Sequence, residues 1–339
     1  MKITSLNIKN FKSIVDITIN EPNPFTVFVG PNGSGKSNIF EALEFANLAK
    51  NDNAEDIFGG RKTFLNFNHF TDPELSFDIS FLFQFKDSDY KRHTWFINDK
   101  FKTDRELTRI STRRIGFEES GKMLDEVKNL HQKQLNNFHR LFIGKSEIER
   151  QKITSENFLS LTASNLEKVL KRLLDNSTIK QEILDWLELF IPEFENIEVR
   201  KSDFSSNEEL LIYQKHYEKP FNKELISDGT YNILCLLTAV LQSDGPQFLC
   251  IEEPENGLNP FVIRKLVDFF RQSCEEKGHY IWLNTHSQTL VESLKPEELI
   301  VVDKVNGETQ VKQFKGMDLH GLDMSELWLS GALGGGTPW

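Results

Sequence analysis

A glycine-rich segment near the start of the chain, GPNGSGKS, has the residue types and spacing of a phosphate-binding loop. Gly30, Gly35, Lys36 and Ser37 fill the four fixed positions of G-x-x-x-x-G-K-[ST]. Glycines let backbone N–H groups turn towards phosphate oxygens, the lysine places a charge on the β and γ phosphates, and the serine hydroxyl completes the ligand shell of Mg²⁺. We therefore expect nucleotide contacts from Gly30, Pro31, Asn32, Gly33, Ser34, Gly35, Lys36, Ser37 and Asn38.

The residues around this loop predict the elements that aim it. An apolar, β-prone run at 25–29 precedes it, and Ile39, Leu43 and Ala46 follow it at helical spacing. Strand, glycine loop and helix in this order direct a helix N-terminus at phosphate. The pattern predicts nucleotide binding, but such loops occur in kinases, GTPases, transporters, helicases and chromosome-handling ATPases.

Two carboxylates and a histidine are expected beside the loop. Glu252 and Glu253 end the apolar segment QFLCIEE, and His286 ends HYIWLNTHS. Both segments are typical of buried parallel strands, whose carboxyl ends meet where α/β proteins bind ligands. Glu252 suits a role on Mg²⁺, Glu253 is placed to polarise a water for attack on the γ-phosphate, and His286 is placed to hydrogen-bond that phosphate. Taken singly, the same residues are compatible with an acidic loop and a turn histidine.

The segment ISDGTYNILCLL indicates a second anion site. Ser227, Asp228, Gly229 and Thr230 begin a predicted helix, and a serine and a glycine at a helix N-terminus favour anions. Since the chain already has one phosphate loop, we expect a dimer in which this segment of one protomer caps the γ-phosphate held by its partner. In isolation the tetrapeptide is an ordinary helix N-cap with a glycine.

The hydrophobic pattern predicts an α/β fold with a β-rich N-terminal lobe and a mainly parallel core sheet flanked by helices. Strands are expected at 2–8, 15–19 and 75–86, and a hairpin is expected to turn at Asn98-Asp99. A further hairpin is expected to turn at Asn306-Gly307.

Helices are expected from about 118 to 191, where apolar residues from Leu159 to Leu173 and from Ile179 to Phe190 follow steps of three and four. Strands return at 195–215, and Asn259-Pro260 marks a helix start. The expected division of the chain is 1–117, an N-terminal ATPase lobe; 118–194, an inserted helical lobe; 195–315, a C-terminal ATPase lobe; and 316–339, a Gly-rich tail.

Composition bounds the function class. The net charge of −11 gives no overall basic footprint for nucleic acid, although it leaves room for a local basic surface. No apolar run approaches the roughly 20 residues of a membrane span, and a secretory leader is not recognisable. Cys235, Cys250 and Cys274 lack metal-type spacing and are expected to be buried thiols in a reducing environment, which favours a cytoplasmic protein.

The motifs FKS at 11–13, GPNGSGKSN, ISDGT, CIEEPENGLNP and NTHS, in that order, resemble the ABC-class ATPases of the SMC, RecF and OLD group. The likeness is greatest to the small RecF/OLD-like ATPases of bacterial antiphage-defence systems. The resemblance implies ATP and Mg²⁺ as ligands and a homodimer, or a higher oligomer, closed over ATP. It also implies that Lys12 and Ser13 reach the nucleotide.

Departures from the family pattern qualify this expectation. SDGT replaces the SGG of transporter ATPases, and Asn259 stands where many relatives have an acidic residue or histidine. The sequence does not place the glutamine-bearing loop of such ATPases, for which Gln84 is a candidate. The residues after His286 are too few for the Toprim nuclease module of OLD proteins, so a separate effector, a nuclease or a toxin, is expected. A RecF- or SMC-like clamp on DNA, and an ATP-gated scaffold or antitoxin, remain the alternatives.

Overall fold

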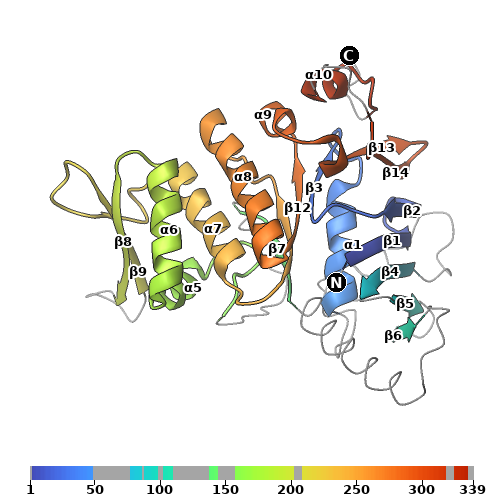
Figure 1. The fold of residues 1–339 in the computed structure, drawn as a ribbon, viewed down its shortest axis with the longest axis horizontal. Coiled ribbons are helices and arrows are strands. Elements are labelled where there is room, and N and C mark those ends of the chain that lie inside the picture. The colour runs from blue at the N-terminus through green and yellow to red at the C-terminus, as the bar shows by residue number, and fades with distance from the viewer. Residues whose placement is uncertain are drawn as a thin grey trace.

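The computed structural model describes residues 2–48, 77–85, 88–97, 102–109, 137–143, 157–201, 208–317 and 324–334. Its centre is a six-stranded sheet in the order β14-β13-β3-β12-β11-β7. The strands are β3 (Phe25–Val29), β7 (Phe138–Leu141), β11 (Phe248–Glu252), β12 (Tyr280–Thr285), β13 (Leu299–Val305) and β14 (Glu308–Gln313). All neighbouring pairs are parallel except β13 and β14, which confirms the mainly parallel core (Figure 1).

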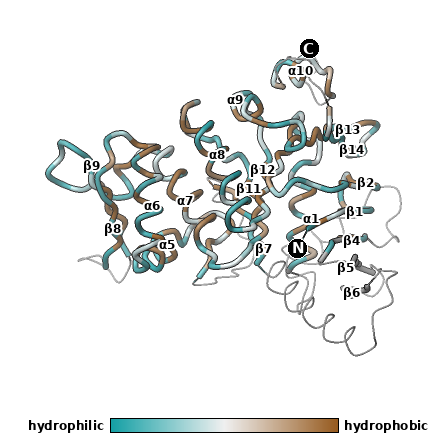
Figure 2. The backbone as a smooth tube through the Cα atoms, viewed as in Figure 1, coloured by the Kyte–Doolittle hydropathy of each residue, from teal (hydrophilic) through white to brown (hydrophobic). Residues whose placement is uncertain are grey.

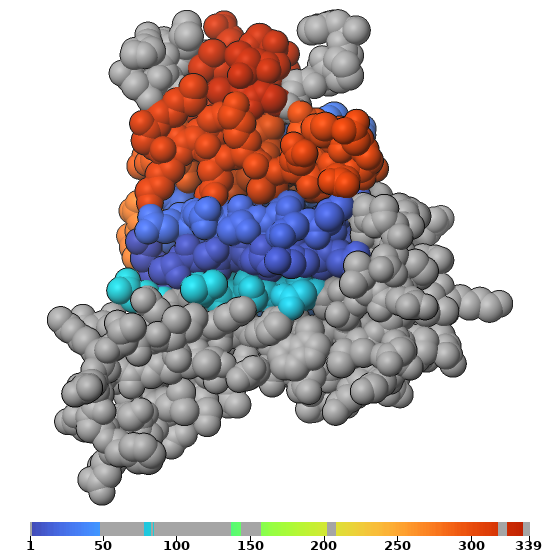
Figure 3. Space-filling view, turned by 90° about the vertical axis from the view of Figure 1, so that its right-hand side faces the viewer, coloured from blue at the N-terminus to red at the C-terminus, as the bar shows by residue number. Residues whose placement is uncertain are grey.

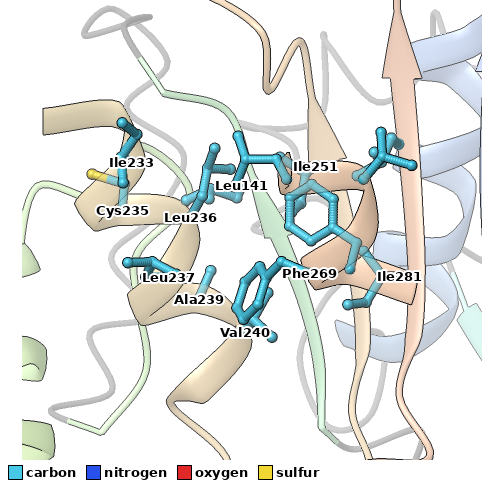
Figure 4. Packing of buried hydrophobic residues seen from close by; sticks show 14 of the residues in the cluster. Leu141, Ile233, Cys235, Leu236, Leu237, Ala239, Val240, Ile251, Phe269 and Ile281 are labelled. Carbon is cyan, nitrogen blue, oxygen red and sulfur yellow. The ribbon is translucent and has the colours of Figure 1, made fainter. Parts of the chain in front are cut away.

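Helices cover both faces of this sheet, which is why its strands are continuously apolar. On one face Phe28 and Trp282 pack against α1 (Lys36–Leu48) and the N-terminal strands. On the other face lie α7 (Asp228–Leu241) and α8 (Pro260–Lys277). Figure 4 shows side chains from α7, α8, β7 and β11 meeting in this second layer.

The N-terminal strands form a second sheet, in the order β2-β1-β4-β5-β6. Neighbours are antiparallel throughout, and the elements are β1 (Lys2–Phe11), β2 (Ile14–Asn20), β4 (Phe77–Phe85), β5 (Ser88–Ile97) and β6 (Lys102–Arg109). The strands expected at 2–8, 15–19 and 75–86 correspond to β1, β2 and β4, while the expected turn at Asn98-Asp99 lies outside the described residues. Gln313 joins the two sheets, because its side chain exchanges two hydrogen bonds with the backbone of Asn20, at 2.7 and 2.8 Å. Figure 3 shows the N-terminal strands as a band between the C-terminal residues and β4.

A smaller lobe combines α5 (Leu166–Leu174) and α6 (Ser177–Phe190) with the sheet β10-β9-β8. These strands are β8 (Phe194–Lys201), β9 (Glu208–Gln214) and β10 (Phe221–Asn222). Helix α6 buries Ile183, Leu187 and Phe190 and turns polar residues outward, so hydrophobic and hydrophilic positions alternate along it (Figure 2). The expected boundary at 194/195 falls inside β8, after its first residue Phe194, and β8 contacts α6.

Of the span from 118 to 191, for which helices are expected, the structure describes 137–143 and 157–191, and there the expectation is wrong at two places. Residues 138–141 are β7, an edge strand of the core sheet. The helix expected from Leu159 begins only at Leu166, because Ala163 has a left-handed φ of +56° that a helix cannot contain. Both deviations depend on tertiary contacts of short segments, which the periodicity of apolar residues does not record.

The predicted helix start at Asn259-Pro260 and the predicted turn at Asn306-Gly307 are confirmed. Asn259 caps α8 by accepting from the Val262 N–H at 3.0 Å, and Pro260 begins the helix. Asn306 and Gly307 have φ values of +53° and +88° in the turn between β13 and β14. The tail carries α10 (Met324–Leu329), and a short α9 (Gln288–Glu292) follows β12. No helix in the described part of the chain is long and apolar enough to cross a membrane.

Candidate nucleotide site at the carboxyl edge of the core sheet

The glycine loop lies between β3 and α1, as the sequence predicts. Gly30, Gly33 and Gly35 have φ values of +153°, +77° and +107°, a region that favours glycine. The Lys36 ammonium folds back over the loop and donates to the carbonyl oxygens of Gly30, at 2.8 Å, and Pro31, at 3.1 Å. Burial lowers the pKa of Lys36 to about 8, and nearby carboxylates oppose that shift. The Lys36 ammonium is therefore held by the carbonyl oxygens of its own loop.

The hairpin formed by β13 and β14 packs against the phosphate loop. A Cβ on Gly30 would lie 1.9 Å from the Val302 carbonyl oxygen on β13, and one on Gly35 would lie 2.1 Å from Thr309 Oγ1 on β14. Thr309 Oγ1 donates to the Ser34 carbonyl oxygen at 2.8 Å. The hairpin thus fixes the shape of the loop, a role that the sequence alone does not reveal.

Ser13 and Asn38 lie where the hairpin meets the loop. The hydroxyl oxygens of Ser13 and Thr309 are 2.6 Å apart, and the Asn38 side-chain amide donates to Ser13 Oγ at 2.7 Å. Lys12, with a φ of +52°, forms an ion pair with Glu41 of α1. The structure therefore places Lys12, Ser13 and Asn38 next to the loop, each with a protein partner.

Glu252, the carboxylate predicted to act on Mg²⁺, contacts Ser37 at the end of the phosphate loop. Ser37 Oγ donates to Glu252 Oε2 at 2.7 Å, and the Asn284 side-chain amide donates to the same oxygen at 3.3 Å. Glu252 is the last residue of β11, Asn284 lies in the neighbouring strand β12, and Ser37 lies in the first turn of α1. Two residues 215 positions apart in the chain are thus joined at the sheet edge.

Glu253 follows directly and has a strained backbone. Its φ is +49°, and its N–H donates to the carbonyl oxygen and to the side chain of Asn284, at 3.0 and 3.2 Å. Asn256 donates to Glu253 Oε2 at 3.1 Å. Left-handed backbone costs free energy for a residue with a Cβ, and the hydrogen bonds to Asn284 hold Glu253 in this conformation.

His286 lies at the end of β12, within electrostatic range of both Lys36 and Glu253. Burial and the Lys36 charge lower the pKa of His286, whereas Glu253 raises it. The backbone N–H of His286 donates to Glu255 Oε1 at 3.0 Å, and Thr285 Oγ1 donates to the same oxygen at 2.5 Å. Glu255 thus holds the turn that carries the histidine, a contact that sequence reasoning missed.

Arg140 is a second residue that sequence reasoning missed. It lies on β7, beside β11, and its guanidinium contacts Glu252 as well as Glu41 and Glu44 of α1. Gln84 is not part of this site. It lies on β4 opposite Lys2 of β1, and Lys2 lies roughly 30 Å along the chain of β1 from Lys12, so Gln84 is not near the phosphate loop.

The predicted second anion site lies at the surface. Ser227 is the N-cap of α7 and accepts from the Thr230 N–H at 3.1 Å, and both Ser227 and Asp228 are exposed. A Cβ on Gly229 would lie 2.4 Å from the Gly257 carbonyl oxygen, so the helix start sits against the loop that follows Glu253. The described contacts of the segment 227–230 are with that loop and its own helix.

The residues of the loop and the sheet edge fit Mg·ATP. The left-handed φ values of Gly30, Gly33 and Gly35 give the loop the shape of a phosphate-binding loop, in which backbone N–H groups and the helix N-terminus favour phosphate. The Ser37 hydroxyl and the Glu252 carboxylate are hard oxygen ligands of the kind that Mg²⁺ uses together with phosphate oxygens. Lys36 supplies the cation that such a loop presents to the β and γ phosphates.

Comparison with known proteins agrees with this geometry. A family model described as "AAA domain, putative AbiEii toxin, Type IV TA system" matches residues 25–292. The ATP/GTP phosphatase of Helicobacter pylori is 21% identical over 338 residues, which covers 86% of this chain and 87% of that protein. The chromosome partition protein Smc of Methanocaldococcus jannaschii is 49% identical over 43 residues, so the chain spans only 4% of that relative's length.

Among solved structures, an Smc head bound to the C-terminal winged-helix domain of ScpA matches 95% of this chain and 100% of that one. The TM-score is 0.64 at 14% sequence identity. The chain therefore has the fold of SMC head domains, which confirms the predicted ABC-type ATPase head.

Proposed function

The chain belongs to the AAA-domain family of the AbiEii type, and from this premise we propose that it binds and hydrolyses ATP as a dimer that controls a partner effector. The observation that carries the hydrolytic part is the hydrogen bond of 2.7 Å between Ser37 Oγ and Glu252 Oε2. It joins the phosphate loop to the acidic sheet edge in one protomer. The matches to an ATP/GTP phosphatase and to SMC heads support the same reading.

Each side chain has a distinct task in this proposal. The loop backbone and Lys36 bind the phosphates, and Ser37 with Glu252 would hold Mg²⁺, which shields phosphate charge when it is bound. Glu253, directed by its left-handed backbone and by Asn256, orients the attacking water and accepts its proton. His286 donates to the γ-phosphate from the end of β12.

The surface around Ser227 supports the dimer. Two large apolar side chains flank this anion site and the loop after Glu253, and both are exposed: Leu225 at 67% and Phe261 at 54%. An exposed helix N-terminus with apolar neighbours suits contact with the nucleotide of a second protomer, because the phosphate adds charge complementarity to apolar burial. The contact of Gly229 with Gly257 then links this surface to the protomer's own Glu253.

The proposed effector is a toxin or a nuclease, and the proposed role is antiphage defence. The family's description, which names a toxin of a type IV TA system, and the Smc head that was solved with a ScpA domain support a partner protein. The same Smc likeness supports the second candidate function, a clamp that acts on DNA directly. A third, an ATP-gated scaffold or antitoxin, needs the same loop but not Glu253.

Two variants separate these functions. Glu253→Gln should bind ATP with wild-type affinity, lose steady-state hydrolysis and accumulate as an ATP-bound dimer in light scattering, whereas Lys36→Ala should lose binding, hydrolysis and dimer together. Normal hydrolysis by Glu253→Gln would exclude the proposed base. Partner capture from the native host by Glu253→Gln but not by Lys36→Ala supports effector control, and ATP-dependent binding of purified protein to gapped DNA supports the clamp.

A further inference from the structure

Arg140 occupies a buried position between three carboxylates. Its side chain is 3% exposed. Nε donates to Glu252 Oε1 at 2.7 Å and one terminal nitrogen donates to Glu44 Oε2 at 2.8 Å, while the other also contacts Glu252 and lies 3.6 Å from Glu41 Oε1. Buried charges persist only when they are paired, so this arginine is the counter-charge of the cluster.

The backbone explains how these groups converge. Arg140 stands opposite Cys250 in the parallel pair β7–β11, so it shares a face of the sheet with Cys250 and Glu252. Glu41 and Glu44 are three residues apart on α1, which covers that face, and they therefore project side by side towards β7. A guanidinium has five donors in a fixed plane and can hold a carboxylate in one orientation, whereas an ammonium is a compact charge with three rotating donors.

The two oxygens of Glu252 have different partners. Among the described contacts, Glu252 Oε1 accepts hydrogen bonds only from the Arg140 guanidinium, whereas Oε2 accepts from Ser37 and Asn284. A carboxylate that is clamped at one oxygen can rotate little about its terminal bond. Its second oxygen therefore stays directed at the serine hydroxyl that ends the phosphate loop.

We propose that Arg140 is a positioning residue that holds Glu252 with Oε2 towards Ser37 and thereby sets the affinity of the nucleotide site for its divalent cation. The inference rests on the proposed ATP site and names a residue on which its metal affinity depends. In this proposal Arg140 acts through Glu252 and is not itself a ligand of phosphate or metal. Removal of such an outer partner of a metal-binding carboxylate lowers metal affinity by about 10- to 100-fold.

The chain offers a matched control. Arg271 of α8 also clamps a buried glutamate, with Nε to Glu298 Oε1 at 2.8 Å and a terminal nitrogen to Oε2 at 2.9 Å. Its guanidinium lies over Phe25, at the amino end of β3, whereas the phosphate loop follows the carboxyl end. Loss of Arg271 therefore removes a comparable ion pair without touching the nucleotide site.

The test is Mn²⁺ binding to the full chain in the presence of ATP, measured by electron paramagnetic resonance as the loss of the free Mn²⁺ signal beyond the loss that the same ATP concentration causes without protein. ATP binding without metal is measured separately with a fluorescent ATP analogue. Arg140→Lys should weaken Mn²⁺ binding, and Glu44→Gln/Arg140→Met should weaken it further, by about 10- to 100-fold, with metal-free ATP binding unchanged. Arg271→Lys should leave both affinities at the wild-type value.

Wild-type Mn²⁺ affinity in folded Arg140→Lys and in the double variant would overturn the inference and leave the ATP site intact. Equal losses in Arg271→Lys would overturn it as well, because a general loss of packing would then explain the effect. If the double variant does not fold, Arg140→Lys decides alone, since it keeps the charge and loses the planar clamp. Failure of the wild-type chain to bind ATP would instead refute the proposed function.

Discussion

The hairpin β13–β14 packs behind the phosphate loop. This packing predicts very different losses of ATP affinity when Gly30 or Gly33 is replaced by alanine. In Gly33→Ala the new Cβ meets nothing within 4 Å, and only the left-handed φ of +77° is unfavourable. That conformation costs about 1–2 kcal/mol. In Gly30→Ala the Cβ would lie 1.9 Å from the Val302 carbonyl oxygen, which belongs to the backbone of β13 and cannot rotate away.

Relief of that contact requires the loop and β13 to separate, an overpacking cost of about 1–3 kcal/mol in addition to the backbone term. Without ATP, the loop of this variant relaxes to a conformation that does not bind phosphate. ATP binding must then supply the free energy that returns the loop to its binding conformation. We therefore expect Gly33→Ala to weaken ATP binding by about 5- to 30-fold and Gly30→Ala by about tenfold to hundredfold more.

Titration with a fluorescent ATP analogue gives both affinities, and thermal unfolding of the same samples shows whether the chains are folded. Equal affinities of the two folded alanine variants would refute the reasoning. The packing of the hairpin against the loop would then have no part in nucleotide binding.

Three further perturbations have defined outcomes. Burial holds His279 neutral with a pKa of about 4, so the folded chain should lose stability as pH falls from about 6.5 to about 4, and His279→Gln should flatten that decline in thermal unfolding. Asn259→Ala removes the cap of α8 and should lower the free energy of unfolding by about 1 kcal/mol in urea titrations. Glu255→Gln should lower kcat with little change in ATP affinity, because it loosens the turn that carries His286.

Each of these three predictions would be contradicted by a specific result. An unchanged acid slope in His279→Gln would show that other groups carry the pH dependence. Wild-type stability of Asn259→Ala would mean that water replaces the cap without cost. Wild-type turnover in Glu255→Gln would show that the position of His286 does not depend on the carboxylate.

The loop, the carboxylates at 252 and 253 and the helix caps were predictable because their chemistry is local. A glycine loop, an N-cap asparagine before proline and an Asn-Gly turn each require particular residues at fixed short spacing. The parallel core was predictable for a related reason, since strands buried on both faces must be apolar throughout.

Strand β7 and Arg140 were not predictable in the same way. A four-residue strand carries too little periodicity to separate it from a neighbouring helix, and its parallel partner is remote in sequence. An arginine within FHRLF gives no sign that it reaches a glutamate 112 positions away. The same holds for Thr309, whose contact with Ser34 spans 275 positions.

The most direct test of the composite dimer site is a mixing experiment with two inactive variants. Lys36→Ala should remove phosphate binding in its own protomer, and Ser227→Arg should fill the anion site that each protomer is proposed to offer to its partner. In an equal mixture half of the dimers pair the two variants, and each such dimer keeps one complete site, so ATPase activity should return to about a quarter of the wild-type rate. A mixture no more active than either variant alone, or a fully active Ser227→Arg chain, would contradict the dimer that this site is proposed to form.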